Sequence, residues 1–255
     1  MIELVTATRF VTPLREGGSL PGLVEASDFG TYVVKFRGAG QGLKVLVAEV
    51  VVGELARRLG LRVPELKMVQ LGADIARYEA DEEVQDLLNA SLGFNLGVDF
   101  LPGALGWHPK AEVPREQAAA VLWLDAFTAN VDRSWRNPNL LLWHRELVLI
   151  DHGAALYFHH SWDSPTATPN RFAAQPYDFS DHVFATAAAD LAAVDADYAA
   201  RVDAQLLAEV VDQVPPEWLE TSEQRPRPED VRRAYVEFLT ARLAQRESWL
   251  PGARR

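Results

Sequence analysis

The sequence predicts an α+β protein of two lobes, with a β-rich N-lobe over residues 1–103 and a mainly helical C-lobe over residues 104–255. Two observations support this division. The first hundred residues are rich in Val, Gly and short alternating runs, which are typical of strands. The remainder is dominated by Ala-rich segments with helical periodicity. The dipeptide Pro102-Gly103 marks the expected hinge between the two.

The predicted N-lobe alternates strands with two helices. The residue pattern from Thr31 to Phe36 is typical of a strand. The preceding turn contains Gly30, where a positive φ suits glycine. Val47, Val51, Leu55 and Leu59 have helical spacing, and Gly60 follows them as a C-cap. The expected elements are strands over 23–26 and 31–36, a helix over 45–59, a strand over 64–71, a helix over 81–92 and a strand from 97.

The predicted C-lobe begins with a buried helix. Pro114 suits a first helical turn, and the helix is expected to run to Thr128. Two apolar runs, 140–142 and 147–150, are separated by four residues and predict a β-hairpin. Further helices are expected near 185–213 and 228–249.

Composition excludes several classes of protein. A formal net charge of −11 argues against nucleic-acid binding, which needs clustered Lys and Arg. The chain has no cysteine, so a metal would have to be bound by oxygen or imidazole. No apolar run approaches the roughly 20 residues that cross a bilayer, and the first residues lack the pattern of a secretory signal. We therefore expect a cytoplasmic protein without a membrane segment.

Asp132, Asn137 and Asp151 have the spacing of a phosphoryl-transfer site. In such a site one Asp accepts the proton of the attacking hydroxyl. An Asn five positions later and a second Asp after a buried strand supply oxygen ligands to Mg²⁺. The predicted hairpin begins just past the Asn and ends at Asp151, so both metal ligands are expected at the same end of it.

A positive group is also needed at the nucleotide phosphates. Lys35 lies near the end of an alternating strand, as the strand lysine of kinases does. Its acidic partner is expected on the following helix, where Glu49 and Glu54 are five residues apart and so face different sides. Of these two, we favour Glu49.

Two glycine-rich loops offer backbone amides for phosphates. The first contains Gly17, Gly18 and Ser19 and continues to Gly22, immediately before the first predicted strand. The second covers 37–44 and does not carry the signature of a P-loop NTPase. Either loop is also compatible with a simple flexible turn.

Together these segments resemble the HipA-like kinase family over residues 12 to about 160. The residues that carry the resemblance are Tyr-Val-Val-Lys-Phe at 32–36, Ala48-Glu49, Asn-Val-Asp-Arg at 130–133 with Asn137, and Leu-Ile-Asp-His-Gly at 149–153. The resemblance implies a bilobal protein-kinase-like fold that binds ATP with Mg²⁺ and phosphorylates a hydroxyl, with protein Ser or Thr favoured. It also implies Asp132 as catalytic base, Asn137 and Asp151 as Mg²⁺ ligands, Lys35 as phosphate clamp and Gly17 to Gly22 as phosphate-binding loop. Phe100 and Leu101 would offer backbone to adenine.

The chain departs from that family in two ways. Ser134-Trp135 stands where relatives commonly have His, and the chain is much shorter than the toxin kinases. A small-molecule phosphotransferase is therefore an open alternative, since such enzymes share the pattern of Asp, Asn and second Asp. The other alternative is a nucleotide-binding pseudokinase that acts as an interaction module. The acceptor, the oligomeric state and any regulation by autophosphorylation do not follow from the sequence.

Overall fold

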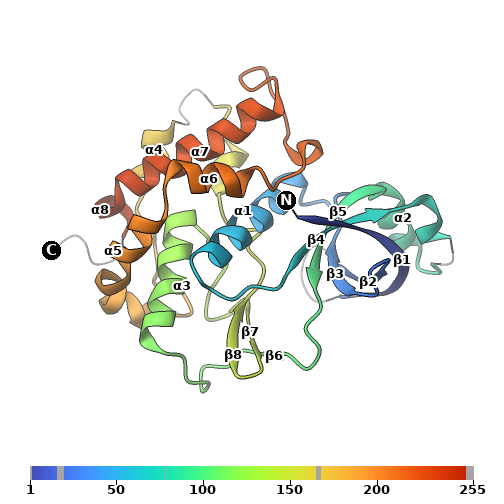
Figure 1. Ribbon diagram of the computed structural model, residues 1–255, viewed down its shortest axis with the longest axis horizontal. Coiled ribbons are helices and arrows are strands. Elements are labelled where there is room, and N and C mark those ends of the chain that lie inside the picture. Colours follow the sequence, from blue (N-terminus) through green and yellow to red (C-terminus); the bar gives the residue numbers. More distant parts are fainter. Residues whose placement is uncertain (1, 16–19, 78, 165–167, 251–255) are drawn as a thin grey trace. The chain divides into compact units, whose positions relative to one another are not determined.

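The computed structural model describes residues 2–15, 20–77, 79–164 and 168–250. The chain forms two compact units (Figure 1). The first consists of Met1–Leu46 and Pro64–Gly103, and the second of Val47–Val63 and Ala104–Arg255. The first is rich in strands and the second in helices, so the predicted α+β class is confirmed.

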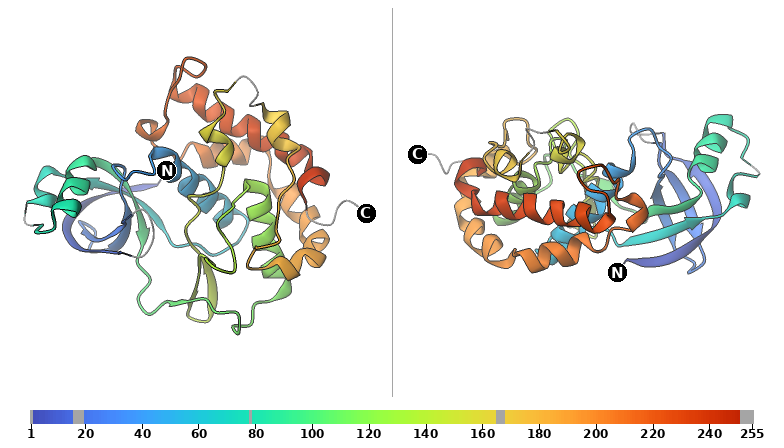
Figure 2. Two further views of the ribbon diagram at one scale, coloured as in Figure 1. Left: turned by 180° about the vertical axis from the view of Figure 1, so that it is seen from behind. Right: turned by 90° about the horizontal axis from the view of Figure 1, so that it is seen from above.

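The first unit is built on a closed barrel of five strands. Its members are β1 (Glu3–Pro13), β2 (Gly22–Ala26), β3 (Thr31–Lys35), β4 (Leu66–Leu71) and β5 (Gly93–Asp99), in the order β1-β2-β3-β5-β4. Neighbouring strands are antiparallel except β1 and β4, which pair in parallel from Glu3 opposite Lys67. Alternate residues of β2 and β3 are buried, and Val24 and Val34 are fully enclosed in the barrel. Figure 2 shows the barrel from two further sides.

Strand β1 was not among the predicted elements. Only Val5 of its eleven residues is buried, and its apolar residues (Leu4, Val5, Ala7, Phe10 and Val11) do not keep a period of two along the strand. Its place is fixed instead by backbone pairing with β2 on one side and β4 on the other. Such backbone pairing cannot be detected from the pattern of apolar residues in a single strand.

A short helical segment packs on the barrel. It comprises the 3₁₀ turn η1 (Ala73–Ala76) and helix α2 (Glu82–Ala90), the latter close to the predicted range 81–92. Asp81 caps α2 by accepting hydrogen bonds from the backbone N–H groups of Glu83 and Val84, at 3.0 and 3.4 Å. The side chains of Val84 and Leu88 are buried and pack against the core of the barrel.

Helix α1 (Leu43–Arg58) belongs mostly to the second unit, although its segment falls inside the predicted N-lobe 1–103. The reason lies in the contacts of its C-terminal part. The guanidinium of Arg201 donates to the carbonyl of Arg58 at 2.9 Å, and the carbonyl of Arg62 accepts from the backbone of Leu149 at 2.9 Å. Gly60 has a φ of 85°, which suits the predicted C-cap.

The second unit surrounds helix α3 (Arg115–Thr128), in which every residue from Ala118 to Thr128 is buried. Trp123 and Phe127 of α3 pack with Trp249 in one aromatic cluster. The other helical elements are η2 (Tyr157–His160), α4 (Pro169–Ala173), η3 (Ala185–Asp190), α5 (Leu191–Arg201), α6 (Ala204–Val211), η4 (Pro216–Trp218), α7 (Pro228–Ala244) and α8 (Arg246–Trp249). Within the described residues, no helix has the length and apolar character needed to span a membrane.

The predicted hairpin is present as β7 (Leu140–Trp143) and β8 (Glu146–Leu149), and β6 (Leu105–Gly106) adds a third strand. Leu140 lies opposite Leu149, and Trp143 opposite Glu146. The turn residues His144 and Arg145 both have positive φ, at 51° and 66°, as a two-residue hairpin turn requires. This register aligns the segment before β7 with the segment after β8.

Candidate active site

The predicted catalytic loop leaves the C-terminus of α3. Ala129 ends the helix in the left-handed conformation, with a φ of 54°. The backbone N–H groups of Ala129 and Asn130 both donate to the carbonyl of Asp125, which closes the last turn. The chain then turns away from the helix axis and passes through Asp132 to β7.

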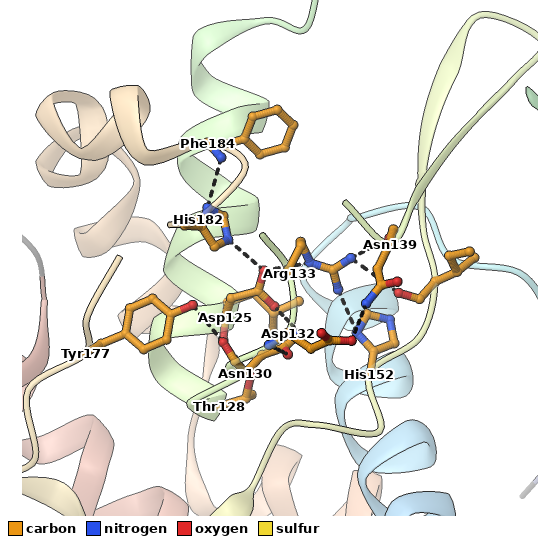
Figure 3. Close-up of polar contacts among 12 residues, drawn as sticks. Asp125, Thr128, Asn130, Asp132, Arg133, Asn139, His152, Tyr177, His182 and Phe184 are labelled. Carbon is orange, nitrogen blue, oxygen red and sulfur yellow. Dashed lines mark hydrogen bonds and ion pairs between the residues drawn. The ribbon is translucent and has the colours of Figure 1, made fainter. Parts of the chain in front are cut away.

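Asp132 is half-buried and is held by two side-chain amides. Its Oδ2 accepts from Nδ2 of Asn137 at 2.8 Å and from Nδ2 of Asn139 at 3.1 Å. Its backbone N–H donates to Oδ1 of Asn130 at 3.1 Å. Because both amides bond the same oxygen, they fix the orientation of the carboxylate and leave Oδ1 outside both hydrogen bonds. Figure 3 shows Asp132 between Tyr177 on one side and Asn139 on the other.

The hairpin brings the segments of Asn137 and Asp151 to the same end. Beyond the last paired residues of β7 and β8, the backbone N–H of Ile150 donates to the carbonyl of Asn139 at 3.1 Å. Asn137 therefore lies two residues before this link and Asp151 one residue after it. Asn139 and Asp151 both have left-handed backbones, with φ of 49° and 56°. Non-glycine residues in this conformation are uncommon, and they gather at functional sites.

Arg133, the residue after Asp132, ties the loop to the hairpin. Its side chain is fully buried, and its Nη1 donates to the carbonyls of Asn139 and Ile150, the latter at 3.3 Å. Its Nη2 lies 3.1 Å from Nδ1 of His152. A single guanidinium thus binds residues on both sides of the hairpin end, next to the two predicted metal ligands.

The other partner of Arg133 is Asp125, inside α3. The distance from Nε to Oδ2 is 2.7 Å, and Asp125 also accepts from Nδ2 of Asn130 at 2.9 Å. Nε2 of His182 lies 3.0 Å from Oδ2. Burial would raise the pKa of Asp125, but the charge of Arg133 and the hydrogen bond of His182 lower it to about 2. The carboxylate is therefore charged at neutral pH and holds three segments of the chain together (Figure 3).

The sequence analysis did not identify Asp125, Asn139 or His182. A signal for Asp125 existed, because it is the one acidic residue in the apolar run of α3 from Ala118 to Thr128. A charge at such a position needs a buried partner. Nothing in the sequence indicates that His182, fifty-seven residues later, is one of those partners.

The predicted nucleotide-binding residues fall mainly in the first unit. Lys35 is the last residue of β3 and lies opposite Leu96 of β5. Phe100 and Leu101 follow β5, and the backbone N–H of Phe100 donates to the carbonyl of Thr31 at 3.0 Å. Glu49 is buried on α1, in the part of the helix that belongs to the second unit.

The first predicted phosphate loop cannot be placed, because Gly17, Gly18 and Ser19 lie outside the described residues. The second loop is held by the C-terminal end of α2. The backbone N–H of Gly38 donates to Oγ of Ser91 at 3.1 Å. A Cβ at Gly38 would come within 2.8 Å of the backbone of Ala90, so only glycine allows this close approach.

The ligands predicted for a metal are an amide oxygen and a carboxylate. Both are hard oxygen donors of the kind that Mg²⁺ binds, with water and phosphate oxygens completing the octahedron. Among the residues that the structure describes, no group of three or more His, Cys, Asp or Glu could hold a metal ion. An amide oxygen and a single carboxylate, the predicted ligand set, are typical of a cation that keeps water and phosphate ligands rather than of a closed zinc-type site.

Comparison with known proteins identifies the family of the chain. The family model for HipA-like kinases matches residues 7–251, so the chain belongs to this family. The search of curated proteins returned no match. Among solved structures, the chain is similar to a crystal structure of the Helicobacter pylori proinflammatory kinase CtkA, with a TM-score of 0.58 and 13% sequence identity. The similarity covers 99% of this chain and 96% of that one, and it concerns the fold.

Proposed function

We propose that this HipA-like kinase binds ATP with Mg²⁺ and transfers the γ-phosphate to a hydroxyl group, with Ser or Thr of a protein favoured as the acceptor. One observation carries the proposal. The carboxylate of Asp132 is oriented by the amide of Asn137, in a loop that Arg133 ties to the hairpin end before Asp151. The three residues that phosphoryl transfer needs therefore belong to segments that the buried Arg133 ties together.

In this proposal Asp132 accepts the proton of the acceptor hydroxyl as that oxygen attacks phosphorus. A general base must lie within hydrogen-bond reach of the proton that it takes. The two amides on Oδ2 fix the carboxylate, so Oδ1 is the oxygen that receives the proton. Holding one rotamer in this way lowers the entropic cost of aligning the reacting groups.

Asn137 and Asp151 are the proposed ligands of Mg²⁺. When bound, the cation would neutralise charge on the β- and γ-phosphates. The proposed ligand of Asn137 is its amide oxygen Oδ1, because Nδ2 already donates to Asp132. This arrangement couples the orientation of the base to that of the metal ligand.

The remaining roles are proposed from family membership. Lys35 is proposed to contact the phosphates and Glu49 to orient it. The backbone of Phe100 and Leu101 is proposed to bind adenine, and Gly17, Gly18 and Ser19 to contact phosphate. In this proposal residues 1–103 and 104–255 correspond to the two lobes of a protein-kinase-like fold.

The test separates nucleotide binding from transfer. Binding of Mg·ATP is measured by calorimetry, and transfer by incubation with γ-labelled ATP and a Ser/Thr peptide library. The wild type is expected to do both. Asp132→Asn should keep binding and lose transfer by about 10²- to 10⁴-fold, the usual contribution of a general base. Asp212→Asn removes the same charge from a side chain that is 69% exposed and serves as the matched control.

Two results would contradict the proposal. Equal rates of phosphate transfer by Asp132→Asn and the wild type would show that Asp132 is not the general base. Binding of Mg·ATP without transfer to any peptide or to small hydroxyl compounds would favour the nucleotide-binding module instead.

A further inference from the structure

A pocket of about 430 Å³ opens beside the catalytic loop, within the second unit. Val131 and Arg133, the two neighbours of Asp132, both line it. Its other walls come from Tyr157 and from the segment 175–182. Its volume lies in the range of sites that bind a side chain or a small ligand. It is therefore placed to receive a group close to the acceptor hydroxyl.

The exposed charges of this pocket are negative. Asp178 and Asp181 are its acidic lining residues, and both are exposed. Hydrogen bonds from the backbone and side chain of Ser180 lower the pKa of Asp178, so this carboxylate is charged at neutral pH. The cation among the lining residues is Arg133, whose buried guanidinium is already bonded to Asp125, Asn139 and Ile150.

His182 does not change this charge balance. The backbone N–H of Phe184 donates to its Nδ1 at 3.0 Å, so the ring proton lies on Nε2 and points to Asp125. His182 is thus a neutral donor within the buried network. It also connects the wall of the pocket to the helix that positions the catalytic loop.

Oδ1 of Asp181 accepts from the indole Nε1 of Trp135 at 3.2 Å, and the cation that competes for its carboxylate is Arg136. Their ion pair of 3.1 Å joins side chains that are 63% and 65% exposed, and Arg136 is not among the residues lining the pocket. A surface pair of this kind contributes about 0–1 kcal/mol. A ligand cation can therefore compete for the carboxylate of Asp181.

Aromatic and apolar groups complete the surface. Tyr157 and Tyr177 line the pocket, and the hydroxyl of Tyr177 donates to the carbonyl of Asn130 at 2.7 Å, which fixes its ring. Tyrosine rings attract ammonium and guanidinium groups. Val131 in the lining is 68% exposed, and Trp135, whose backbone bonds that of Asp181, is 60% exposed. These exposed side chains offer contacts to residues on both sides of a bound cation, which suits a peptide better than an isolated amine.

We propose that this pocket binds a Lys or Arg side chain of the acceptor, a few residues from the phosphorylated Ser or Thr. The inference rests on the kinase function proposed above and names its substrate class. A cation between Asp178 and Asp181 would hold the acceptor segment against the loop that carries Asp132. Acidic segments would be repelled by the same two carboxylates.

The test is a binding measurement that needs no phosphate transfer. Fluorescence anisotropy of the full chain is recorded with labelled Ser peptides in which the flanking residues are Lys, Gln or Glu. The wild type should bind the Lys peptide about ten-fold more tightly than the Glu peptide at low salt, with the difference shrinking at high salt. Asp178→Asn with Asp181→Asn should reduce that ratio to about two-fold.

A matched control is Asp197→Asn. Asp197 is 65% exposed, as Asp181 is, and is also paired with an Arg, Arg201, but it lies on α5 away from the pocket lining. This variant should keep the full preference for Lys. Asp178→Asn alone, which breaks no ion pair among the residues that the structure describes, provides a second variant if the double substitution disturbs folding.

Each outcome bears on the proposal. Equal binding of Lys and Glu peptides by the wild type, or a preference that survives in both Asp178 variants, overturns it. Competition by spermidine, with no binding of peptides, would assign the pocket to a small cationic acceptor and overturn the peptide assignment. Lys-dependent binding without phosphate transfer would support the pocket while contradicting the proposed catalysis.

Discussion

Arg133 and Asp125 form an ion pair in which neither side chain is exposed, with Nε 2.7 Å from Oδ2. The pair joins α3, the helix that precedes the loop of Asp132, to the residue that follows Asp132. Buried ion pairs contribute little net stability, but removal of one partner leaves an uncompensated charge. We therefore interpret this pair as fixing the geometry of the loop.

Replacing Arg133 with Ala should destabilise the protein by about 3–5 kcal/mol, because Asp125 would stay buried without its cation. Urea unfolding followed by circular dichroism measures this change. Arg136→Ala is the control, because that side chain is 63% exposed and its pair with Asp181 contributes about 1 kcal/mol or less. An equal effect of the two substitutions would contradict the role given to Arg133.

The free energy of unfolding should depend on pH through the titration of the buried Asp125. Its ordinary pKa is 3.8 and its pKa in the folded protein is about 2. A lowered folded pKa stabilises the fold above the unfolded pKa, and that contribution is lost as the pH falls from about 4 to about 2. The expected loss is about 2 kcal/mol. Unfolding free energies of the wild type and Asp125→Asn, compared across this range, measure it; parallel curves would argue against the ion pair.

Asn137 and Asn139 should differ in their response to Mg²⁺. Asn137→Ala removes a proposed ligand and should raise the Mg²⁺ concentration for half-maximal transfer by about ten-fold or more. Asn139→Ala removes a hydrogen bond to Asp132 and places alanine at a φ of 49°, so its main effect should be a loss of about 1–2 kcal/mol of stability. Titration of activity with Mg²⁺ and thermal unfolding separate the two. If the Mg²⁺ dependence shifted only in Asn139→Ala, the proposed ligand would be wrong.

Lys35→Met should weaken the binding of ATP while leaving the fold intact, since Lys35 is only partly buried at the end of β3. A lysine contact to phosphate is charge-assisted, so its loss should weaken binding by about ten-fold or more. Lys110→Met, at an exposed residue of the second unit, is the matched control. Calorimetry with Mg·ATP gives both affinities, and equal values would exclude the phosphate contact.

Arg242 should be essential for stability although it has no carboxylate partner within the described residues. Its buried guanidinium donates to the carbonyls of Ala126, Phe127, Phe172 and Gln175, and burial lowers its pKa to about 10. Arg242→Met would remove the donor to these four carbonyls, of which that of Phe172 keeps a backbone partner, the N–H of Gln175, and the loss should cost about 3 kcal/mol or more. Thermal unfolding measures the loss. Arg233→Met, at a side chain that is 61% exposed on the same helix, should change the stability little.

Local sequence determined much of the fold. Alternating runs predicted β2 and β3, helical spacing predicted α1 and α3, and two apolar runs predicted the hairpin β7–β8. These elements are set by the period of their apolar residues, which is visible in a single segment. Strand β1 was missed because its pairing, and not its pattern, holds it in the barrel.

For the site, the sequence by itself determined which residues are available: Asp132, Asn137 and Asp151 were predicted from their spacing and from the strand before Asp151. Only the tertiary structure decided how that loop is held. Asp125 and His182 meet although they are 57 positions apart in the chain, and Arg133 donates to carbonyls on both sides of the open end of a hairpin. The partners of a buried charge depend on which distant segments pack against it. That packing cannot be read from the spacing of residues along the chain.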